Sequence, residues 1–420
     1  MGEVVDLFAG PGGWDLAAMT LGLTPLGIEW DEAACATREA AWLRTLCADV
    51  AAVDPADYGK LDGLIASPPC TAFSMAGAGE GRDAVHVYVE AITRWCAQGE
   101  APDYAQLDEA CGDPSAHLVL EPMRWAWATD PEWIALEQVP SVLPVWEAIG
   151  TALTTRDYYV WTGLLSAEQY GVPQTRTRAI LLARKKRYGP VSAPPATHQR
   201  YVAPRVKEKQ EESLFDVPEP ERIVLPEDEG LLPWVSMAQA LGWDEHDRVG
   251  FRATNDRPNA ATRDVDEPAP TVMFGGRLNT VTWEAQRPAT TVMGDARIAP
   301  AGHHDTHMKG SVRVTVAEAA VLQSFPAGYP FQGTRTKQFQ QVGNAVPPLL
   351  AWAALKAVVP GAVDVPVEHP RMASERPFDG RMRVEIRRGG ERIDEGFDPD
   401  AAPADTLTTR TNRWQIKEES

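Results

Sequence analysis

The sequence predicts an α/β protein in which a doubly wound, mostly parallel sheet is joined to a second, mostly β or irregular domain. Up to about Ala183, short apolar runs alternate with helical stretches, which is the pattern of layered α/β folds. A glycine-rich loop follows the first apolar run, at the place where such folds bind ligands. After Arg184 the alternation stops and prolines multiply, which indicates a different domain.

Each element of the first domain follows from its local pattern. Apolar runs predict strands at residues 3–8, 24–29, 45–48, 63–66, 134–137, 158–164 and 179–183. Helical spacing predicts helices at residues 14–22, 32–43 and 117–128, and a final helix that is entered through Pro347 and Pro348. Residues 77–114 are long for a crossover and begin with several glycines, so we interpret them as a candidate mobile lid.

The second part of the chain contains a short repeat in which Pro-Ala precedes β-branched residues. Each copy suits a strand that begins at a rigid proline turn, although six-residue matches also arise by chance. The copies stand at residues 268–273, 288–293 and 403–408, and a polar linker or flexible loop is expected at 208–229. We expect domains at residues 1–184 and 185–310, a return to the first domain at 311–360, and an extension of unknown role at 361–420.

The composition excludes several classes of protein. The chain has 420 residues, of which 44% are hydrophobic and 24% charged, and a mean hydropathy of -0.29, which suits large buried cores. No run approaches the roughly 20 apolar residues of a membrane span, and no basic start of a secretory signal is present, so we expect a cytoplasmic protein without a membrane partner. The cysteines at 35, 47, 70, 96 and 111 form no C-x-x-C pair and have no histidine at zinc spacing. We therefore expect neither a disulfide framework nor a metal site.

Charge is unevenly distributed along the chain. Residues 1–170 hold 26 acidic and 7 basic side chains, which accounts for the whole formal charge of -19. Residues 171–210 carry ten Lys or Arg side chains against the single acidic Glu208. This basic run is either a solvated surface or a source of contacts to nucleic-acid phosphates, with residues 184–187 as the first candidates.

Residues 6–13, Asp-Leu-Phe-Ala-Gly-Pro-Gly-Gly, stand where the first strand passes into the first helix. Small residues there let a nucleotide-like ligand approach the backbone, although a plain tight turn explains the glycines equally well. Glu29 ends the second strand, where a carboxylate can accept ribose hydroxyls. Trp30 offers a face for adenine, and Asp49 offers an acceptor for its amine. Together they predict an adenosine pocket, which NAD would also largely satisfy.

Residues 67–70, Ser-Pro-Pro-Cys, follow the fourth predicted strand. Two prolines cannot continue a strand ladder, so Cys70 is presented on a stiff loop at the ligand-binding edge. A thiolate in that place can add to carbon 6 of a pyrimidine and so make carbon 5 nucleophilic enough to take a methyl group. The alternative is a buried, inert cysteine.

The chain resembles the cytosine-C5 DNA methyltransferase family in six blocks, which follow the family's order over about 345 residues. The blocks lie at residues 6–13, 67–70, 137–139, 174–178, 313–326 and 343–348. Two positions depart from the family pattern. Thr71 and Gln138 stand where the family commonly has Gln and Asn.

The resemblance implies a Rossmann-like fold that uses S-adenosyl-L-methionine, with catalysis in residues 1–184 and target recognition in 185–310. Cys70 is then the covalent nucleophile, and the carboxyl group of Glu137 hydrogen-bonds ring nitrogen 3 of the cytosine. Arg178 would bind the cytosine oxygen, and Arg176 would support the Glu137 and Cys70 loops. The implied cofactor contacts are Phe8, Gly10, Gly12, Glu29, Trp30, Asp49, Val50, Pro69, Asn344 and Val346.

The implied partner is double-stranded DNA, from which the target base is rotated out of the stack, and a restriction endonuclease of the same system is a second candidate partner. A tRNA cytosine methyltransferase of the same fold usually lacks a large recognition insert, so the roughly 125 residues between Arg184 and Lys309 favour DNA. A non-catalytic, S-adenosylmethionine-binding DNA regulator is the other alternative, supported by Thr71 and Gln138. An NAD-dependent oxidoreductase would give Cys70 no role.

Overall fold

The structure, a computed structural model, describes four long stretches of the chain and several short strands. They are residues 2–69, 85–202, 224–242, 249–252, 262–263, 268–270, 280–283, 311–313, 315–363, 387–388 and 391–392. The chain divides into two compact units, Met1–Gly380 and Arg381–Ser420. In the second unit the described residues form the paired strands β14 (Arg387–Arg388) and β15 (Glu391–Arg392). The finer domain boundaries expected from the sequence stay a prediction.

The first unit is built on a seven-stranded sheet of order β3-β2-β1-β4-β5-β8-β6. Its strands are β1 (Val4–Leu7), β2 (Leu26–Glu29), β3 (Thr45–Cys47), β4 (Gly63–Ala66), β5 (Trp133–Gln138), β6 (Tyr158–Ser166) and β8 (Thr177–Lys185). The first five in the order are parallel, whereas β8 is antiparallel to both β5 and β6. The seven predicted strands are confirmed, with ends that differ from the prediction by at most two residues. Connections leave β1 and β4 in opposite directions across the sheet, which marks the switch point where open α/β sheets bind ligands.

The described helices include all those that the sequence predicted. They are α1 (Gly13–Thr20), α2 (Glu32–Ala40), α4 (Val85–Gln98), α5 (Tyr104–Cys111), α6 (Glu121–Thr129), α7 (Leu143–Thr154), α8 (Met237–Leu241), α9 (Val316–Leu322), α10 (Arg335–Asn344) and α11 (Pro348–Val358). The helix expected at 117–128 is α6, which follows a 3-10 turn at Ala116–Leu120 and has a proline in its own first turn. Helix α7 was not predicted, although it lies between β5 and β6, where a crossover is required.

The segment that we interpreted as a mobile lid contains two packed helices in its described part. Residues 85–111 contain the whole of α4 and the whole of α5. In α4 the buried residues Tyr88, Ala91, Ile92 and Trp95 recur at spacings of three and four, so they form one apolar stripe against the core. The glycines at 77–81, which prompted the lid interpretation, lie outside the described residues.

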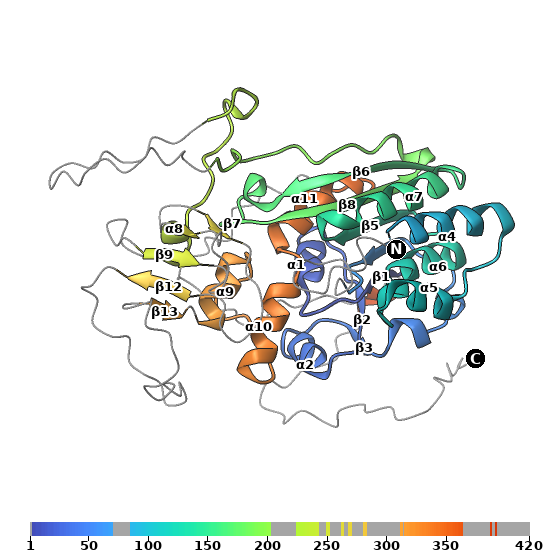
Figure 1. The fold of residues 1–420 in the computed structure, drawn as a ribbon, viewed down its shortest axis with the longest axis horizontal. Helices are drawn as coiled ribbons and strands as arrows, with labels where there is room; N and C mark the ends of the chain where they lie inside the picture. Colours follow the sequence, from blue (N-terminus) through green and yellow to red (C-terminus); the bar gives the residue numbers. More distant parts are fainter. Residues whose placement is uncertain are drawn as a thin grey trace. The chain divides into compact units, whose positions relative to one another are not determined.

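Alternate residues of the strands face two separate cores. Val5 of β1 packs in a cluster with Trp146 of α7, whereas its neighbour Val4 packs in a cluster with Leu350 of α11. Helices α4 to α7 therefore cover one face of the sheet, and α1 and α11 cover the other (Figure 1). A third cluster joins α8, α9 and α10 around the buried ring of Phe325. This arrangement is the predicted doubly wound fold.

Two smaller sheets contain strands of the segment 185–310, in which a second domain was expected. One is antiparallel and has the order β10 (Thr262–Arg263), β9 (Val249–Arg252), β12 (Thr280–Trp283) and β13 (Ser311–Arg313). The other pairs β7 (Gln174–Thr175) in parallel with β11 (Ala269–Pro270). The first repeat copy thus begins a strand at its Pro-Ala step, and the other two copies lie outside the described residues. The β7–β11 pair connects β7, the strand before β8, directly to residues 185–310, which we call the inserted segment.

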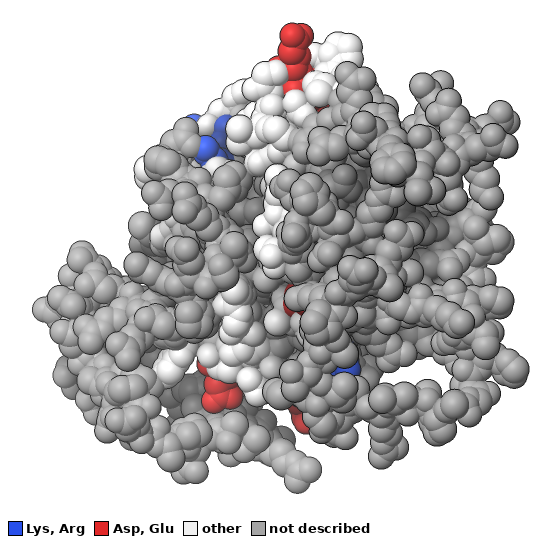
Figure 2. Space-filling view, turned by 90° about the vertical axis from the view of Figure 1, so that its left-hand side faces the viewer, with Lys and Arg blue, Asp and Glu red and all other residues white. Residues whose placement is uncertain are grey.

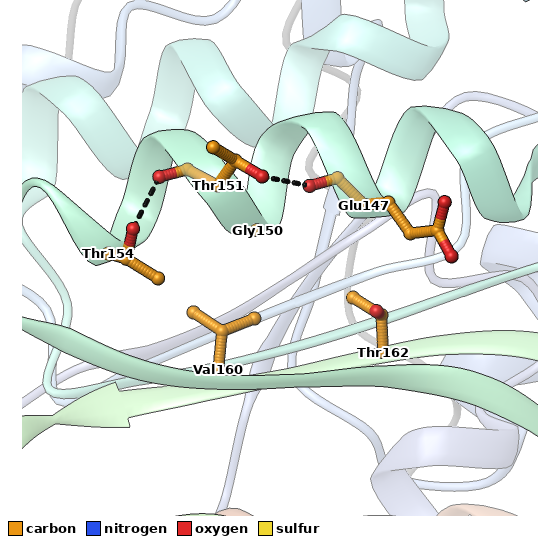
Figure 3. A pocket seen from close by; sticks show the side chains of 6 residues that line it. All are labelled: Glu147, Gly150, Thr151, Thr154, Val160 and Thr162. Atoms are coloured by element: carbon orange, nitrogen blue, oxygen red, sulfur yellow. Dashed lines mark hydrogen bonds between the residues drawn. The ribbon is translucent and has the colours of Figure 1, made fainter.

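A surface pocket of about 330 Å³ lies between α7 and the edge strand β6, where Glu147 and three threonines line it (Figure 3). The hydroxyls of Thr151 and Thr154 donate to carbonyl oxygens within α7 itself, at 2.9 and 2.6 Å. The pocket is therefore a groove between packed elements, and it does not contain any residue predicted for the site. In the described part of the chain, no helix is long and apolar enough to cross a bilayer, and no cluster of His, Cys, Asp or Glu is arranged to hold a metal ion.

Arg38 of α2 is fully buried beneath the glycine loop, and each of its five N–H donors has an acceptor. Its Nη1 and Nη2 atoms each donate to one carboxylate oxygen of Asp15, at 2.7 Å. The other donations reach the carbonyl oxygens of Ala9 (3.4 Å) and Arg44 (3.1 Å) and the hydroxyl of Thr45 (3.0 Å). One guanidinium therefore joins the loop after β1 to α1, α2 and β3.

Other buried groups pack closely around the Arg38–Asp15 ion pair. A Cβ on Gly27 would lie 1.9 Å from Nη2 of Arg38, so only glycine lets β2 pass this close. Asp6 of β1 is also fully buried nearby. Burial, and then the charge of Asp15, raise the pKa of Asp6 well above its ordinary value, although Arg38 acts in the opposite direction. Asp6 is thus favoured as the neutral acid.

We expect Arg38→Met to lower the free energy of unfolding by about 3–5 kcal/mol, because it leaves the Asp15 carboxylate buried without its partner. The double variant Asp15→Leu/Arg38→Met should lose less than the single one, since neither charge then remains buried. Urea unfolding of both variants measures the difference. A double variant that loses as much stability as Arg38→Met, or more, would contradict this account.

Asp6 gives a pH dependence of defined sign. An unfolded Asp ionises near pH 3.9, whereas folded Asp6 retains its proton to higher pH, so the unfolded state is favoured as pH rises from about 4 towards the folded pKa. We expect Asp6→Asn to remove this pH-dependent loss of stability. The free energy of unfolding of the variant should therefore increase relative to that of the wild type as the pH rises. Urea unfolding between pH 5 and pH 8 tests this, and parallel stability curves would refute it.

Candidate active site and cofactor pocket

The glycine loop leaves the end of β1 in a conformation that few residue types adopt. Phe8, Gly10 and Gly12 have positive φ angles of 57°, 54° and 103°. A Cβ on Gly12 would lie 2.2 Å from the side chain of Leu43, so this position requires glycine, whereas a Cβ on Gly10 would meet no atom within 4 Å. Open space therefore adjoins the loop at Gly10, beside the strained Phe8.

Glu29 lies beside this open space at the end of β2. Its carboxylate accepts the backbone N–H groups of Gly10 (2.8 Å), Trp30 (3.0 Å) and Asp31 (2.8 Å), and so ties two loops together. A carboxylate accepts about four hydrogen bonds, which leaves capacity for a ribose hydroxyl. The Trp30 side chain is 75% exposed next to it. An acceptor and a free aromatic face beside open space fit an adenosine group.

The residues predicted after β3 reach the same edge of the sheet. Asp49 caps a 3-10 turn at Val50–Ala52, and its carboxylate accepts the N–H of Ala51 at 3.0 Å. Val50 is buried, and Asp49 is exposed. Since β1, β2 and β3 are parallel neighbours, the residues that follow each strand lie at one edge. The adenosine half of the predicted pocket is therefore brought together.

The chain returns to the glycine loop near its last helices. A Cβ on Gly13 would lie only 2.1 Å from the carbonyl oxygen of Val346, so the two backbones are in direct contact. The hydroxyl of Tyr329 donates to the carbonyl oxygen of Pro11. Asn344, at the end of α10, is exposed next to this contact. The two predicted cofactor residues of the last block thus lie beside the first block, as expected.

Helix α10 also contacts the start of α2, next to Trp30. Lys337 forms an ion pair with Asp31, which caps α2 through the N–H groups of Ala33 and Ala34. Partial burial would raise the pKa of Asp31, but the hydrogen bonds and charge of Lys337 and the two amides lower it overall. The sequence analysis missed this pair, because only the fold brings residues so far apart in the chain together.

The loop that leads to Cys70 is held by two side chains from neighbouring elements. Trp14 of α1 donates from Nε1 to the hydroxyl of Ser67, at 2.9 Å. Gln138, at the end of β5, donates from Nε2 to the carbonyl oxygen of Pro68, at 2.5 Å. Pro69 is described and partly buried, whereas Cys70 and Thr71 lie outside the described residues. The loop that precedes the predicted nucleophile therefore starts from a fixed position at the switch point.

Glu137 lies on β5 next to Gln138, and its Oε1 atom is 2.9 Å from Nε of Arg178 on β8. Both side chains are largely buried, with 6% and 12% of their surface exposed. Arg176 is buried as well, and its Nη2 atom donates to the carbonyl oxygen of Ala345, at 3.1 Å. Arg178 is thus the arginine that contacts Glu137, whereas Arg176 contacts the corner before α11. The resemblance had suggested that Arg176 supports the Glu137 and Cys70 loops, which stays a prediction.

Residues 184–187, the first candidates for phosphate contacts, lie at the end of β8 that is opposite to Arg178. Lys185 is buried and pairs with Asp130, and Arg187 pairs with Glu132 just before β5. Arg184 donates to the carbonyl oxygens of its own turn. Because β8 is antiparallel to β5, its last residues lie far from Glu137. The expected phosphate contacts at 184–187 stay a prediction. On the face drawn in Figure 2, acidic and basic side chains both occur among the described residues, and neither forms a continuous patch.

The structure corrects the expectation that the cysteines form no disulfide. Cys35 of α2 and Cys47 of β3 form one, with their Cα atoms 6.0 Å apart. No pattern in the sequence indicated this bond, because eleven residues separate the two cysteines and only the packing of α2 beside β3 aligns them. Among the other cysteines described, Cys96 is exposed and Cys111 is buried.

Comparison with known proteins agrees with this arrangement. A model of the C-5 cytosine-specific DNA methylase family matches residues 2–93 and 104–359. The type II methyltransferase M1.HphI of Haemophilus parahaemolyticus is 27% identical over 373 residues, which cover 84% of this chain and 86% of that protein. M.AplI of Arthrospira platensis, also a type II methyltransferase, is 27% identical over 362 residues, 84% of this chain and 85% of its own.

A crystal structure of the Dnmt2 methyltransferase of S. pombe aligns over 86% of this chain and 98% of its own, with a TM-score of 0.49 and 15% identity. The family model, by contrast, spans most of the chain and includes every described residue of the site. The chain therefore belongs to the C-5 cytosine-specific DNA methylase family, and it is a DNA cytosine methyltransferase that uses S-adenosyl-L-methionine.

Proposed function

We propose that this enzyme methylates carbon 5 of a cytosine rotated out of a specific duplex sequence, with Cys70 as nucleophile and Glu137 as the group that binds ring nitrogen 3. The observation that carries the proposal is the Glu137–Arg178 pair at 2.9 Å, next to the Pro68 carbonyl that Gln138 holds. These groups stand at the carboxyl edge of β4 and β5, which is where α/β enzymes place their chemistry.

The side chains divide the reaction among themselves. The Cys70 thiolate adds to carbon 6, and the Glu137 carboxyl group donates a hydrogen bond to nitrogen 3, which limits the negative charge on the ring. Carbon 5 would then take the methyl group that bound S-adenosylmethionine supplies, and the sulfur–methyl bond would break to leave S-adenosylhomocysteine. A base removes the proton from carbon 5, and the carbon–sulfur bond breaks to release Cys70.

Arg178 has two roles in this proposal. Its guanidinium orients Glu137 through the ion pair, and the donors that Glu137 and the Thr177 carbonyl leave over would bind the cytosine oxygen. The cofactor would be held by Glu29 and Trp30 on the adenosine side, with the backbone around Gly10 against its amino acid portion. The predicted contacts at Phe8, Gly12, Asp49, Val50, Pro69, Asn344 and Val346 complete this pocket.

DNA recognition is assigned to residues 185–310, in which the described strands β9, β10 and β12 form an antiparallel sheet. A sheet of this kind can present side chains to a DNA groove. Because the relatives are named type II methyltransferases, we also propose a cognate restriction endonuclease that recognises the same sequence. We place the enzyme in the cytoplasm, where its DNA substrate would be accessible.

We expect purified enzyme to transfer labelled methyl groups from S-adenosylmethionine to duplex DNA, and Cys70→Ser to lose about three orders of magnitude in kcat or more. Glu137→Gln should lose about 10²–10³-fold, since it removes the charge-assisted contact to the ring. Cys96→Ser, which alters an exposed cysteine on α4, is the matched control and should keep wild-type activity. Bisulfite sequencing identifies the methylated site. Full activity in Cys70→Ser would overturn the proposal.

Gln138→Met should reduce kcat about tenfold while the affinity for S-adenosylhomocysteine stays unchanged, because the side chain keeps its size but no longer fixes the Pro68 carbonyl. Gln106→Met, on the exposed surface of α5, provides the control. Single-turnover kinetics with duplex DNA separate the chemical step from binding. An unchanged single-turnover rate would show that the Gln138 contact does not position the nucleophile loop.

A further inference from the structure

Two buried side-chain amides, those of Gln174 and Gln323, are joined by hydrogen bonds in a series that we call the amide chain. Gln174, in β7, is fully buried, and its Nε2 atom donates to Oε1 of Gln323 at 2.6 Å and to the carbonyl oxygen of Leu322 at 3.2 Å. Gln323 follows α9 and is also fully buried. The two amides therefore join β7 to the end of α9.

Gln323 continues this chain towards the cofactor pocket. Its Nε2 atom donates to the carbonyl oxygens of Val342 (3.0 Å) and Ala345 (2.9 Å). The Ala345 carbonyl also accepts from Nη2 of Arg176, at 3.1 Å. Ala345 lies between Asn344 and Val346 at the corner before α11, so the amide chain ends on the segment that packs against the glycine loop.

The other end of the amide chain, at Gln174, reaches the inserted segment. Ala269 of β11 pairs with Gln174 in the parallel β7–β11 sheet, and its N–H donates to the carbonyl oxygen of Pro173, at 2.9 Å. Ala269 is fully buried, so this pairing is part of the packed interior. A displacement of β11 therefore acts directly on the backbone that carries Gln174.

Backbone conformation next to Gln323 shows how tightly this point is held. Ser324 has a φ of 64°, in the left-handed region that residues other than glycine seldom occupy. Its hydroxyl accepts the N–H of Leu349 at the start of α11, at 3.2 Å. Such a conformation persists only where the surroundings determine it. The end of α9 is thus fixed both to the corner and to α11.

We propose that Gln174 and Gln323 are positioning residues that couple binding of the target DNA at the inserted segment to binding of the cofactor at the glycine loop. The proposal rests on the proposed function, because it takes residues 185–310 to bind DNA. Breaking one hydrogen bond of a buried amide leaves a polar group without a partner, which costs free energy. Movements in which Gln174 and Gln323 shift together and keep their hydrogen bonds are therefore favoured. Coupling of this kind is reciprocal, since each ligand changes the affinity for the other by the same factor.

The test measures the coupling factor directly. The dissociation constant of S-adenosylhomocysteine is determined by calorimetry with full-length enzyme, alone and in complex with a duplex that carries the sequence found by bisulfite sequencing. A duplex of the same composition in scrambled order serves as the reference. We expect the target duplex to tighten binding about tenfold in the wild type, within the usual range of such couplings.

The variants are Gln174→Met, Gln323→Met and the pair together, with Gln338→Met as the matched control. Gln338 of α10 also donates to two carbonyl oxygens, those of Phe331 and Gly333, but it has no contact with the amide chain. We expect the coupling factor to fall below about threefold in the first three variants and to remain at the wild-type value in the control. The affinity for S-adenosylhomocysteine without DNA should change by less than about threefold, which a general loss of structure would not permit.

Hydrogen exchange of the wild type provides a measurement that does not depend on how the variants fold. The target duplex alone, without cofactor, should slow exchange of the amides in residues 335–350. Absence of this protection, or a coupling factor that survives in the double variant, overturns the proposal. Wild-type enzyme that methylates the duplex yet shows no coupling also overturns it, whereas an enzyme that methylates no DNA overturns the proposed function instead.

Discussion

The buried ion pair of Arg38 and Asp15 is the interaction on which the cofactor half of the structure depends. A guanidinium without water must satisfy all of its donors, and here the carboxylate, two backbone carbonyls and a hydroxyl do so. These acceptors belong to the glycine loop, α1 and β3, while Arg38 itself belongs to α2. The loop is consequently fixed by elements on both sides, and the closeness of Gly27 shows how little room remains. A loop held in this way can present its backbone to a ligand without first being ordered.

The last blocks of the chain complete the site by covering the first. Val346 contacts Gly13, and Tyr329 contacts Pro11, so the glycine loop has a protein surface on one side and open space at Gly10 on the other. The same region receives Arg176 and Gln323 through the Ala345 carbonyl. The glycine loop, Arg176 and Gln323 thus meet in one buried region, although the sequence distributes them over more than three hundred positions.

The basic run illustrates why charge counts along a chain give limited information about binding. The excess of Lys and Arg after residue 171 is real, but Lys185 and Arg187 are used to pair with Asp130 and Glu132 at the far end of the sheet. Arg178, only seven residues before Lys185, lies at the active edge because the strand runs between the two ends. Strand direction therefore decides which charges are available to a substrate, and a linear count does not contain that direction.

Local patterns along the chain predicted the seven strands of the large sheet and the loops that follow β1, β2 and β4. Apolar runs of strand length, glycines at a strand end and the proline pair before Cys70 are local signals, and a local signal survives without knowledge of the partner. Folding, by contrast, brings Arg178 to Glu137, Gln138 to Pro68 and Cys35 to Cys47. The structure also shows that residues 85–111 contain two packed helices. Their apolar spacing was not recognised in the sequence, because the glycines before them suggested a loop. In each of these cases the partner is remote in sequence or the pattern is interrupted, so only packing selects among contacts that the residue types equally allow.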